Sequence, residues 1–533
     1  MKKLIFAALA ACVAASLLSC GGGQSEGDLS NATKPFGSSG SSGSNFQNGS
    51  GVTGLIGIVV DATTGTPIPG VNVAAGALTA TTDANGNFAM PTIPTGTSVV
   101  SFDIASYAPQ SRTVVITSAV ETSVIMLMTP NATTTPATFD PTAGATVTSG
   151  TVAQLTVAAN ALAHADGSAP AAGNATVILT QLSTSLDAYV EPGEYVVTPT
   201  AGGSAPFETF GALDVRVTDS AGTALPNVTG AVTVRIPVST RSAAALPATV
   251  SLFRFDATAG QYVEDGTATL DGTAPNQYYQ GSITRIGPWA AAQAYTASTI
   301  SVCVENQNGV RIPGARVQSD GIDYSGGGAG ETDATGVAQV PMKRSAQAVI
   351  TATSPRSSNS ATISAAQSAA NFTLTPCLIM PTAGLTIRLT WGAAPSDLDS
   401  HLKGPNDTHV FFASTGSLTA QPFAKLDVDD VTSFGPEVIT VSRLGMSTYE
   451  YFVHNFSQSF TPGMTGSPAR IEMRSGPQIR IFFPPAGEGT NLYWRVFQFT
   501  VAADCSVTFA PIQQWASTEP VNPVGSATAN YCP

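Results

Sequence analysis

Two stretches far apart in the chain repeat the same order of short strands and tight turns. Residues 55–91 contain LIGIVVDATTGTPIPGVNVAAG and then TTDANGNFAMP, and residues 300–341 contain ISVCVENQNGVRIPGARVQSDG and then ETDATGVAQVP. Each copy places Ile-Pro-Gly before an alternating strand and closes with Thr-Asp-Ala-x-Gly. Asp and Gly supply turn conformations, and Pro at the start of a strand costs no ladder hydrogen bond. The repeat therefore predicts small β-domains rather than helices.

This order of motifs resembles the carboxypeptidase regulatory-like domain, a small transthyretin-like β-sandwich. The matching elements are Ile68-Pro69-Gly70 with Thr82-Asp83, and Ile312-Pro313-Gly314 with Thr332-Asp333. We assign one such domain to residues 53–129 and a second to residues 298–379. The resemblance implies spacers or binding modules without peptidase residues.

Residues 130–297 show the same strand-like alternation, as in Leu213–Val217 and Val232–Ile236. The order Phe255-Asp256 followed by Gly260-Gln261-Tyr262 resembles a β-rich module found beside carboxypeptidase-like domains in surface proteins. Only 11% of the 533 residues are charged, which favours short exported strands. We expect an all-β protein of tandem β-sandwich domains, Ig-like or transthyretin-like, arranged in a row.

The N-terminal segment has the pattern of an export signal. Lys2 and Lys3 precede an apolar run from Leu4 to Leu18, and the run ends in Leu17-Leu18-Ser19-Cys20. This ending resembles the lipobox of bacterial lipoproteins. The resemblance implies a signal peptide at residues 1–19 and lipidation of Cys20. Gly21 follows, where an Asp would resemble an inner-membrane retention signal, so we expect delivery to the outer membrane, facing the periplasm or the cell surface. Residues 20–52 are nearly all small or polar, so we expect a disordered tether.

The charge distribution argues against nucleic-acid binding. The formal net charge is −13, and no Lys occurs between Lys34 and Lys343, whereas nucleic-acid binding relies on basic clusters. The expected partners are the membrane, through the N-terminal lipid, and an envelope protein or a glycan. We expect a monomer.

Four cysteines remain after Cys12 leaves with the signal and Cys20 takes lipid: Cys303, Cys377, Cys505 and Cys532. Four cysteines allow three pairings. On position alone we favour Cys303–Cys377, joining the first and last strands of one domain, and Cys505–Cys532, pinning the C-terminal tail. No close C-x-x-C pair supports zinc binding at these cysteines.

Residues 380–533 carry the only candidate chemistry. The segments LTW, DLDSHL, LDVDD, GPE and YEYFVH occur in this order. The order resembles the YfaP-type family of uncharacterised bacterial β-sandwich domains, which implies a jelly-roll-like sandwich without an established activity.

The acidic residues of this region predict a cation site. In a strand, alternate side chains share a face, so Asp397, Asp399 and His401 lie together, with Leu398 and Leu402 opposite. Asp427 and Asp429 likewise share a face. Two acidic strand ends repel each other unless a cation lies between them. We therefore hypothesise a Ca²⁺ site at Asp397, Asp399, Asp427 and Asp429, because Ca²⁺ prefers oxygen ligands.

Two alternatives to calcium stay open. Asp residues in loops commonly cap turns, and His401, His409 or His454 could instead bind a transition metal. No nucleophile elbow, phosphate-binding loop or catalytic-type Cys occurs in the chain, so we predict no catalytic residues. The favoured function is a non-enzymatic, lipid-anchored envelope protein presenting binding modules for adhesion, carbohydrate or protein. The alternative is a metal-dependent hydrolase or its accessory subunit, which requires His401 and His454 to converge with Asp399 or Asp427.

Overall fold

The computed structural model confirms the all-β fold. Two 3₁₀ turns, η1 (Ala188–Val190) and η2 (Gln367–Ala369), are the helical elements of the described part of the chain. In that same part, no helix is long and apolar enough to cross a membrane. The structure describes residues 53–131, 137–185, 188–242, 245–306, 308–354, 358–380, 384–392, 394–431, 433, 435–467, 469–475 and 478–532.

The first and third units have the same topology. In the first unit, the sheet order is β4-β1-β7 and β3-β2-β5-β6; in the third it is β24-β21-β27 and β23-β22-β25-β26. In both units the first strand pairs in parallel with the last. The strands of the first unit are β1 (Gly54–Asp61), β2 (Asn72–Ala75), β3 (Leu78–Thr81), β4 (Asn87–Met90), β5 (Gly96–Asp103), β6 (Gln110–Ile116) and β7 (Glu121–Met128). Those of the third are β21 (Ala297–Asn306), β22 (Arg316–Gly321), β23 (Gly327–Glu331), β24 (Val337–Lys343), β25 (Ala348–Thr353), β26 (Ser358–Ile363) and β27 (Phe372–Met380).

The repeated threonine explains why the sequence motif recurs. The buried Thr82 hydroxyl donates to the Ile68 carbonyl at 2.7 Å and accepts from the Val71 amide at 2.9 Å. Thr332 makes the same two bonds, to the Ile312 carbonyl at 2.7 Å and from the Ala315 amide at 2.9 Å. Each threonine thereby satisfies the backbone on both sides of the Pro-Gly turn, where no strand partner is present.

The second unit is an 11-stranded sheet with a small two-stranded sheet, β11-β15, beside it. Its core packs around the fully buried Trp289 and Tyr279. The strands are β8 (Ala137–Phe139), β9 (Ala145–Ser149), β10 (Ala153–Val157), β11 (Leu162–Ala163), β12 (Ala175–Leu182), β13 (Val196–Thr198), β14 (Ala205–Thr218), β15 (Asn227–Val228), β16 (Val232–Pro237), β17 (Thr249–Asp256), β18 (Gln261–Asp271), β19 (Tyr278–Ser282) and β20 (Pro288–Ala294).

The fourth unit is a sandwich of a six-stranded sheet, β31-β32-β33-β28-β35-β36, and a five-stranded sheet, β30-β29-β34-β37-β38. Trp391, Tyr451 and Trp494 fill the core between the two sheets. The strands are β28 (Leu385–Thr390), β29 (Asp399–Lys403), β30 (His409–Val410), β31 (Gly416–Ser417), β32 (Ala424–Val428), β33 (Glu437–Val441), β34 (Thr448–His454), β35 (Arg470–Ser475), β36 (Gln478–Phe482), β37 (Tyr493–Val501) and β38 (Val507–Ala516).

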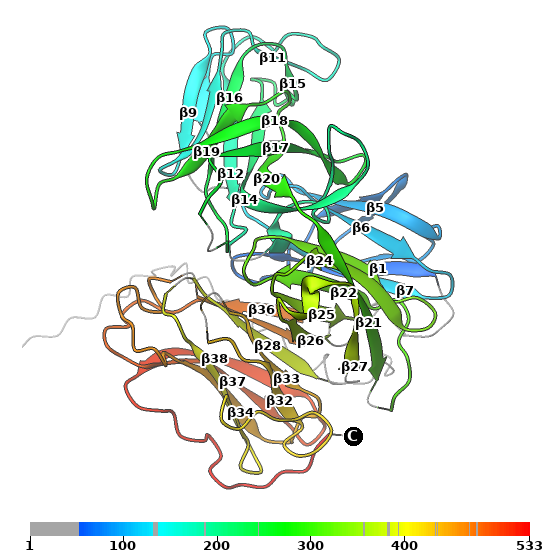
Figure 1. Cartoon of the computed structure of the whole chain (residues 1–533), viewed down its shortest axis with the longest axis vertical. Coiled ribbons are helices and arrows are strands. Elements are labelled where there is room, and N and C mark those ends of the chain that lie inside the picture. The colour runs from blue at the N-terminus through cyan, green and yellow to red at the C-terminus, as the bar shows by residue number, and fades with distance from the viewer. Residues whose placement is uncertain are drawn as a thin grey trace, which may run out of the picture.

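The four units pack against one another and do not lie in the simple row that we expected (Figure 1). One apolar cluster contains Ile58 and Leu127 of the first unit, Phe207 of the second, and Ile479 and Ile481 of the fourth. Burial of these side chains at the junction stabilises the arrangement, because each large aliphatic side chain removed from water contributes roughly 1.5–3 kcal/mol.

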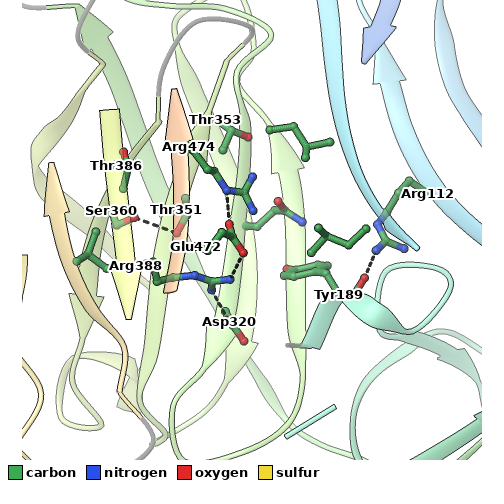
Figure 2. A pocket seen from close by; sticks show the side chains of 14 residues that line it. Arg112, Tyr189, Asp320, Thr351, Thr353, Ser360, Thr386, Arg388, Glu472 and Arg474 are labelled. Atoms are coloured by element: carbon green, nitrogen blue, oxygen red, sulfur yellow. Dashed lines mark hydrogen bonds and ion pairs between the residues drawn. The ribbon is translucent and has the colours of Figure 1, made fainter. Parts of the chain in front are cut away.

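A polar pocket lies where the first three units meet the fourth (Figure 2). Arg388 of the fourth unit contacts Asp320 of the third at 3.0 Å and Glu472 at 3.1 Å. Arg241 of the second unit contacts the same Asp320 at 2.6 Å. Burial raises the pKa of Glu472, but Arg474 and Arg388 outweigh burial and hold that pKa below its ordinary value. At the junction, arginine and acidic side chains of the second, third and fourth units thus form ion pairs that neutralise one another.

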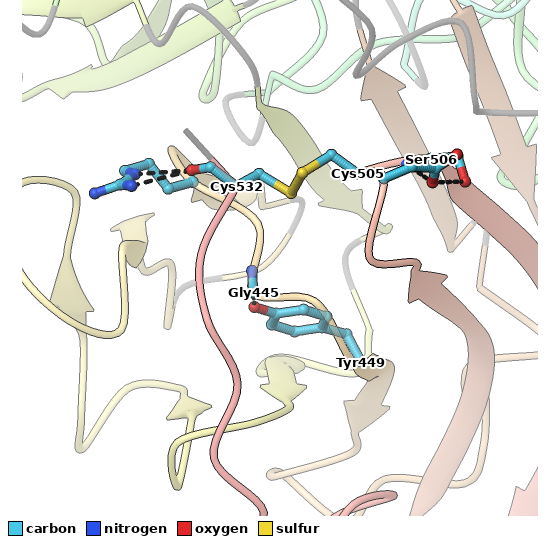
Figure 3. Close-up of a disulfide and its surroundings, with 7 residues drawn as sticks. Gly445, Tyr449, Cys505, Ser506 and Cys532 are labelled. Atoms are coloured by element: carbon cyan, nitrogen blue, oxygen red, sulfur yellow. Dashed lines mark hydrogen bonds between the residues drawn. A yellow bond between two sulfur atoms is a disulfide. The ribbon is translucent and has the colours of Figure 1, made fainter.

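Both disulfides form in the pairing favoured from the sequence. Cys303–Cys377 joins β21 to β27. Cys505–Cys532 fixes the C-terminal tail to the loop before β38 (Figure 3). Arg443 also holds this tail by donating to the Cys532 carbonyl at 3.0 Å. Disulfides are typical of proteins from oxidising compartments.

Candidate metal centre

The alternation predicted around Asp399 is present. Leu398 and Leu402 are fully buried in the core of the fourth unit, while Asp399 and His401 point to the other face of β29. Strand β34 runs antiparallel to β29 and places His454 directly opposite Asp399. Sheet pairing thus brings together residues that are far apart in the sequence.

Asp399, His401 and His454 converge in space. Each offers one ligand atom, and the three atoms lie within 4.8 Å of one another. His454 Nδ1 lies 3.3 Å from Asp399 Oδ2. This convergence is the condition that the transition-metal alternative requires.

His401 is buried and held on two sides. Its Nδ1 lies 3.0 Å from His409 Nε2 in a hydrogen bond, and its ring stacks between Phe411 and Phe452, with centroid distances of 5.1 and 4.8 Å. Burial, followed by the neighbouring His409 and His454, lowers the pKa of His401 to about 2. His401 is therefore neutral at physiological pH, and its Nε2 is a buried nitrogen without a hydrogen-bond partner.

A second group, made only of carboxylates, shares Asp399. Asp399, Asp429 and Glu437 place one oxygen each within 4.8 Å of one another. Burial, with the charges of Asp399 and Asp429 next, raises the pKa of Asp397 to about 6. Burial and the charge of Asp399 raise the pKa of Glu437 well above its ordinary value, although the Ser400 amide donates to its carboxylate. The charged forms of these carboxylates therefore disfavour one another.

Asp427 does not join this group, contrary to the sequence-based expectation. Its carboxylate lies 3.4 Å from Lys425 Nζ, and burial raises its pKa to about 6. The reason is a β-bulge, because the pairing of β32 with β33 passes from Leu426↔Ile439 to Val428↔Val438. A bulge inserts one extra residue and breaks the alternation of faces, so Asp427 and Asp429 do not share a face.

Glu437 and Glu519 belong to the neighbourhood but were not assigned a role from the sequence. Glu437 follows the noted Gly-Pro pair at the start of β33. Glu519 comes from the C-terminal tail, where its carboxylate pairs with Lys403 and lies 3.8 Å from His409 Nε2. No local pattern marks Glu519, because only the tertiary path of the tail brings it to β29.

Exposed aromatic rings border the site. Phe412 and Phe456 are 41% and 48% exposed, and their ring centroids lie 5.5 Å apart. The Phe456 ring also contacts the edge of His454, at 5.8 Å between centroids. By contrast, Tyr449 and Tyr451 of β34 are core residues. The surface therefore offers an apolar rim beside the histidines, made by residues outside β34.

Family comparison assigns one part of the chain. Residues 54–129 match the carboxypeptidase regulatory-like domain. The match confirms the first of the two resemblances drawn from the repeat, and the third unit shares its topology. No curated protein matches the chain.

Three solved structures show weak similarity. A protein of unknown function is 19% identical, with 26% of this chain and 92% of that chain covered and a TM-score of 0.22. A homologue of the telluride resistance protein TerD from Streptomyces coelicolor is 15% identical, with 27% and 98% covered and a TM-score of 0.23. The major pilin subunit of Bacillus cereus is 13% identical, with 62% and 99% covered and a TM-score of 0.14. With TM-scores this low, none of these likenesses bears on function.

The lipidation prediction concerns a different part of the chain. Cys20 and the tether fall within residues 1–52, which lie outside the described residues. The lipid anchor therefore stays a prediction from the sequence.

Proposed function

We propose that this protein is a lipid-anchored component of the bacterial cell envelope that binds a partner without catalysing a reaction, and that Ca²⁺ stabilises its binding unit. The calcium site comprises Asp397, Asp399, Asp429 and Glu437 in the fourth unit. The single observation that carries the proposal is the convergence of oxygens from Asp399, Asp429 and Glu437 within 4.8 Å. Asp397 is included because, after burial, the charges of Asp399 and Asp429 are the next causes of its raised pKa.

Electrostatics supports a cation at this position. Carboxylates that share a partly buried site disfavour one another's charged forms, and a divalent cation would offset that repulsion. Ca²⁺ takes six to eight oxygen ligands at about 2.3–2.6 Å. Four side chains leave positions for water or for hydroxyl groups of a partner. The exposed Phe412 and Phe456 rings lie beside the same face of the sheet, which favours a glycan or an envelope protein as that partner.

The non-catalytic part of the proposal is supported by the carboxypeptidase regulatory-like domain at residues 54–129. A second candidate, a metal-dependent hydrolase or its accessory subunit, is favoured by one observation: Asp399, His401 and His454 converge. Such an enzyme would need an open metal position and a general base.

Calcium binding is tested on the chain from residue 21 onward, made without a lipid anchor or a polyhistidine tag. Three of the four tryptophans, Trp391, Trp494 and Trp515, lie in the fourth unit, so tryptophan fluorescence reports mainly on its unfolding. We expect the thermal midpoint to rise with the logarithm of free Ca²⁺.

Asp429→Asn should abolish this rise, whereas Asp427→Asn, a change of the same type two positions away, should keep it. The proposal is wrong if millimolar Ca²⁺ leaves the midpoint of the parent protein unchanged, or if both variants respond to Ca²⁺ as the parent does.

The anchor is tested by metabolic labelling with a fatty acid in a Gram-negative bacterial host. We expect the label in the parent protein and in Cys12→Ala, and none in Cys20→Ala. A labelled Cys20→Ala variant would contradict lipidation at this residue.

A further inference from the structure

Asp399 belongs to two groups of candidate ligands, one that contains histidines and one made only of carboxylates. His401 and His454 supply imidazole nitrogens, which suit zinc, copper, iron and nickel, whereas carboxylates alone suit calcium and magnesium. The chain contains four histidines. Three of them lie together on the outer face of the sheet formed by β29, β30 and β34: His401, His409 and His454.

The separation of His454 Nδ1 and Asp399 Oδ2 is compatible with two ligands of one metal ion. His454 Nδ1 and Asp399 Oδ2 are 3.3 Å apart, longer than the ~2.7–2.9 Å of a charge-assisted hydrogen bond. Two ligands bound tetrahedrally at about 2.1 Å from zinc lie about 3.4 Å apart. The observed spacing is therefore close to that of two ligands of one ion.

His409 orients the ring of His401, the third proposed ligand. The hydrogen bond between His401 Nδ1 and His409 Nε2, at 3.0 Å, occupies one nitrogen of His401. The other, Nε2, is buried without a partner. Metal-binding histidines usually use one ring nitrogen for the ion and bond the other to a neighbouring group that fixes the ring. The Phe411 and Phe452 rings on either side of His401 hold the same orientation.

Other groups nearby are less suited to the ion. Glu519 could approach His401 and His409, but its carboxylate already pairs with the ammonium group of Lys403. The half-buried His454 borders the exposed Phe456, so a coordination position on this side would be open to solvent or to a partner.

We propose that Asp399, His401 and His454 form a binding site for a zinc-type divalent transition metal, with His409 positioning His401 and at least one coordination position open. The site does not depend on calcium binding, although both sites use Asp399. Zn²⁺ with three protein ligands has this open arrangement in catalytic sites, and a bound ligand hydroxyl or carboxylate could fill it here.

The test measures Zn²⁺ affinity of the untagged chain from residue 21 onward, by competition with a chromogenic chelator. His454→Gln should weaken binding by about 100-fold or more, because it removes one of three ligands, and His409→Gln by about 10- to 100-fold, because it removes the group that orients His401. The matched control is His164→Gln in the second unit. That histidine bonds Ser168 and Asp219 at 2.9 Å each, so its loss should leave Zn²⁺ affinity unchanged.

Two further measurements keep the result interpretable. Co²⁺ substitution of the parent protein should give visible absorption bands of a four- or five-coordinate site, and these bands should be lost in His454→Gln. Asp429→Asn should keep Zn²⁺ affinity while losing the response to Ca²⁺, which separates this proposal from the calcium proposal. The inference is overturned if the parent binds no Zn²⁺, if His454→Gln binds it as tightly as the parent, or if His164→Gln alone loses binding.

Discussion

Asp397 provides the sharpest test of the carboxylate cluster, because its replacement should stabilise the metal-free protein. The pKa of Asp397 is raised from 3.8 to about 6, first by burial and then by Asp399 and Asp429. Below about pH 4 the carboxyl is protonated in both the folded and the unfolded chain. As the pH rises from 4 to 6, the unfolded chain loses this proton while the folded chain retains it, so stability falls.

The size of the effect follows from the shift. A change of about 2.2 pKa units corresponds to about 3 kcal/mol at 1.36 kcal/mol per unit. Because Asp397 is only partly buried, solvent screening reduces this value, and we expect about 1–2 kcal/mol. Asn carries no charge, so Asp397→Asn should be more stable than the parent by that amount at pH 7.5 and equally stable at pH 4.

The assay is urea unfolding followed by tryptophan fluorescence, in EDTA, at several pH values from 4 to 8. The difference in the free energy of unfolding between Asp397→Asn and the parent should grow from pH 4 to pH 6 and then stay constant. Added Ca²⁺ should stabilise the parent but not the variant, so that the parent becomes the more stable of the two proteins. A variant that is less stable than the parent at pH 7.5 in EDTA, or a difference independent of pH, would refute the reasoning.

Three other changes test the fold by the same unfolding assay. Thr82→Val should cost about 2–3 kcal/mol, because it leaves two buried backbone groups without partners, and Thr82→Ser should restore most of it; since the first unit contains no tryptophan, unfolding is followed here by circular dichroism. Replacing Cys505 and Cys532 by Ala should cost about 3.5 kcal/mol, from the entropy of a loop spanning 27 residues; an unchanged midpoint would show that the tail is held by other contacts. Arg388→Met should cost about 1.5–3 kcal/mol, because Asp320 and Glu472 each lose one of their arginine partners, while Arg344→Met, at an exposed position, should change stability by less than about 0.5 kcal/mol.

Sequence reasoning succeeded where a property depends on short-range pattern. The alternation around Leu398 placed Asp399 and His401 on one face, and the repeated Thr-Asp turns marked two units of equal topology. Both features depend on residues only a few positions apart, where strand geometry decides the direction of each side chain.

It failed where the structure depends on irregular or long-range pairing. The bulge at Asp427 has no Gly or Pro to mark it, so alternation was extended across it wrongly. Glu519 reaches Lys403 across 116 positions of sequence. The packing of the units against one another was also not predicted. Ile479 and Ile481 alternate with polar residues as in any strand with one buried face, so no pattern marks them as contacts with other units.

The parallel pairing of first and last strands determines how these units carry mechanical load. In the first unit, a force that enters at Gly54 and leaves at Met128 pulls β1 and β7 in opposite directions along eight register pairs. Their hydrogen bonds would be sheared together instead of opened one by one, which makes rupture slow. In the third unit, Cys303–Cys377 bridges the equivalent pair of strands. A pull along the chain would there be borne by a covalent bond, and the residues between the two cysteines could not be extended.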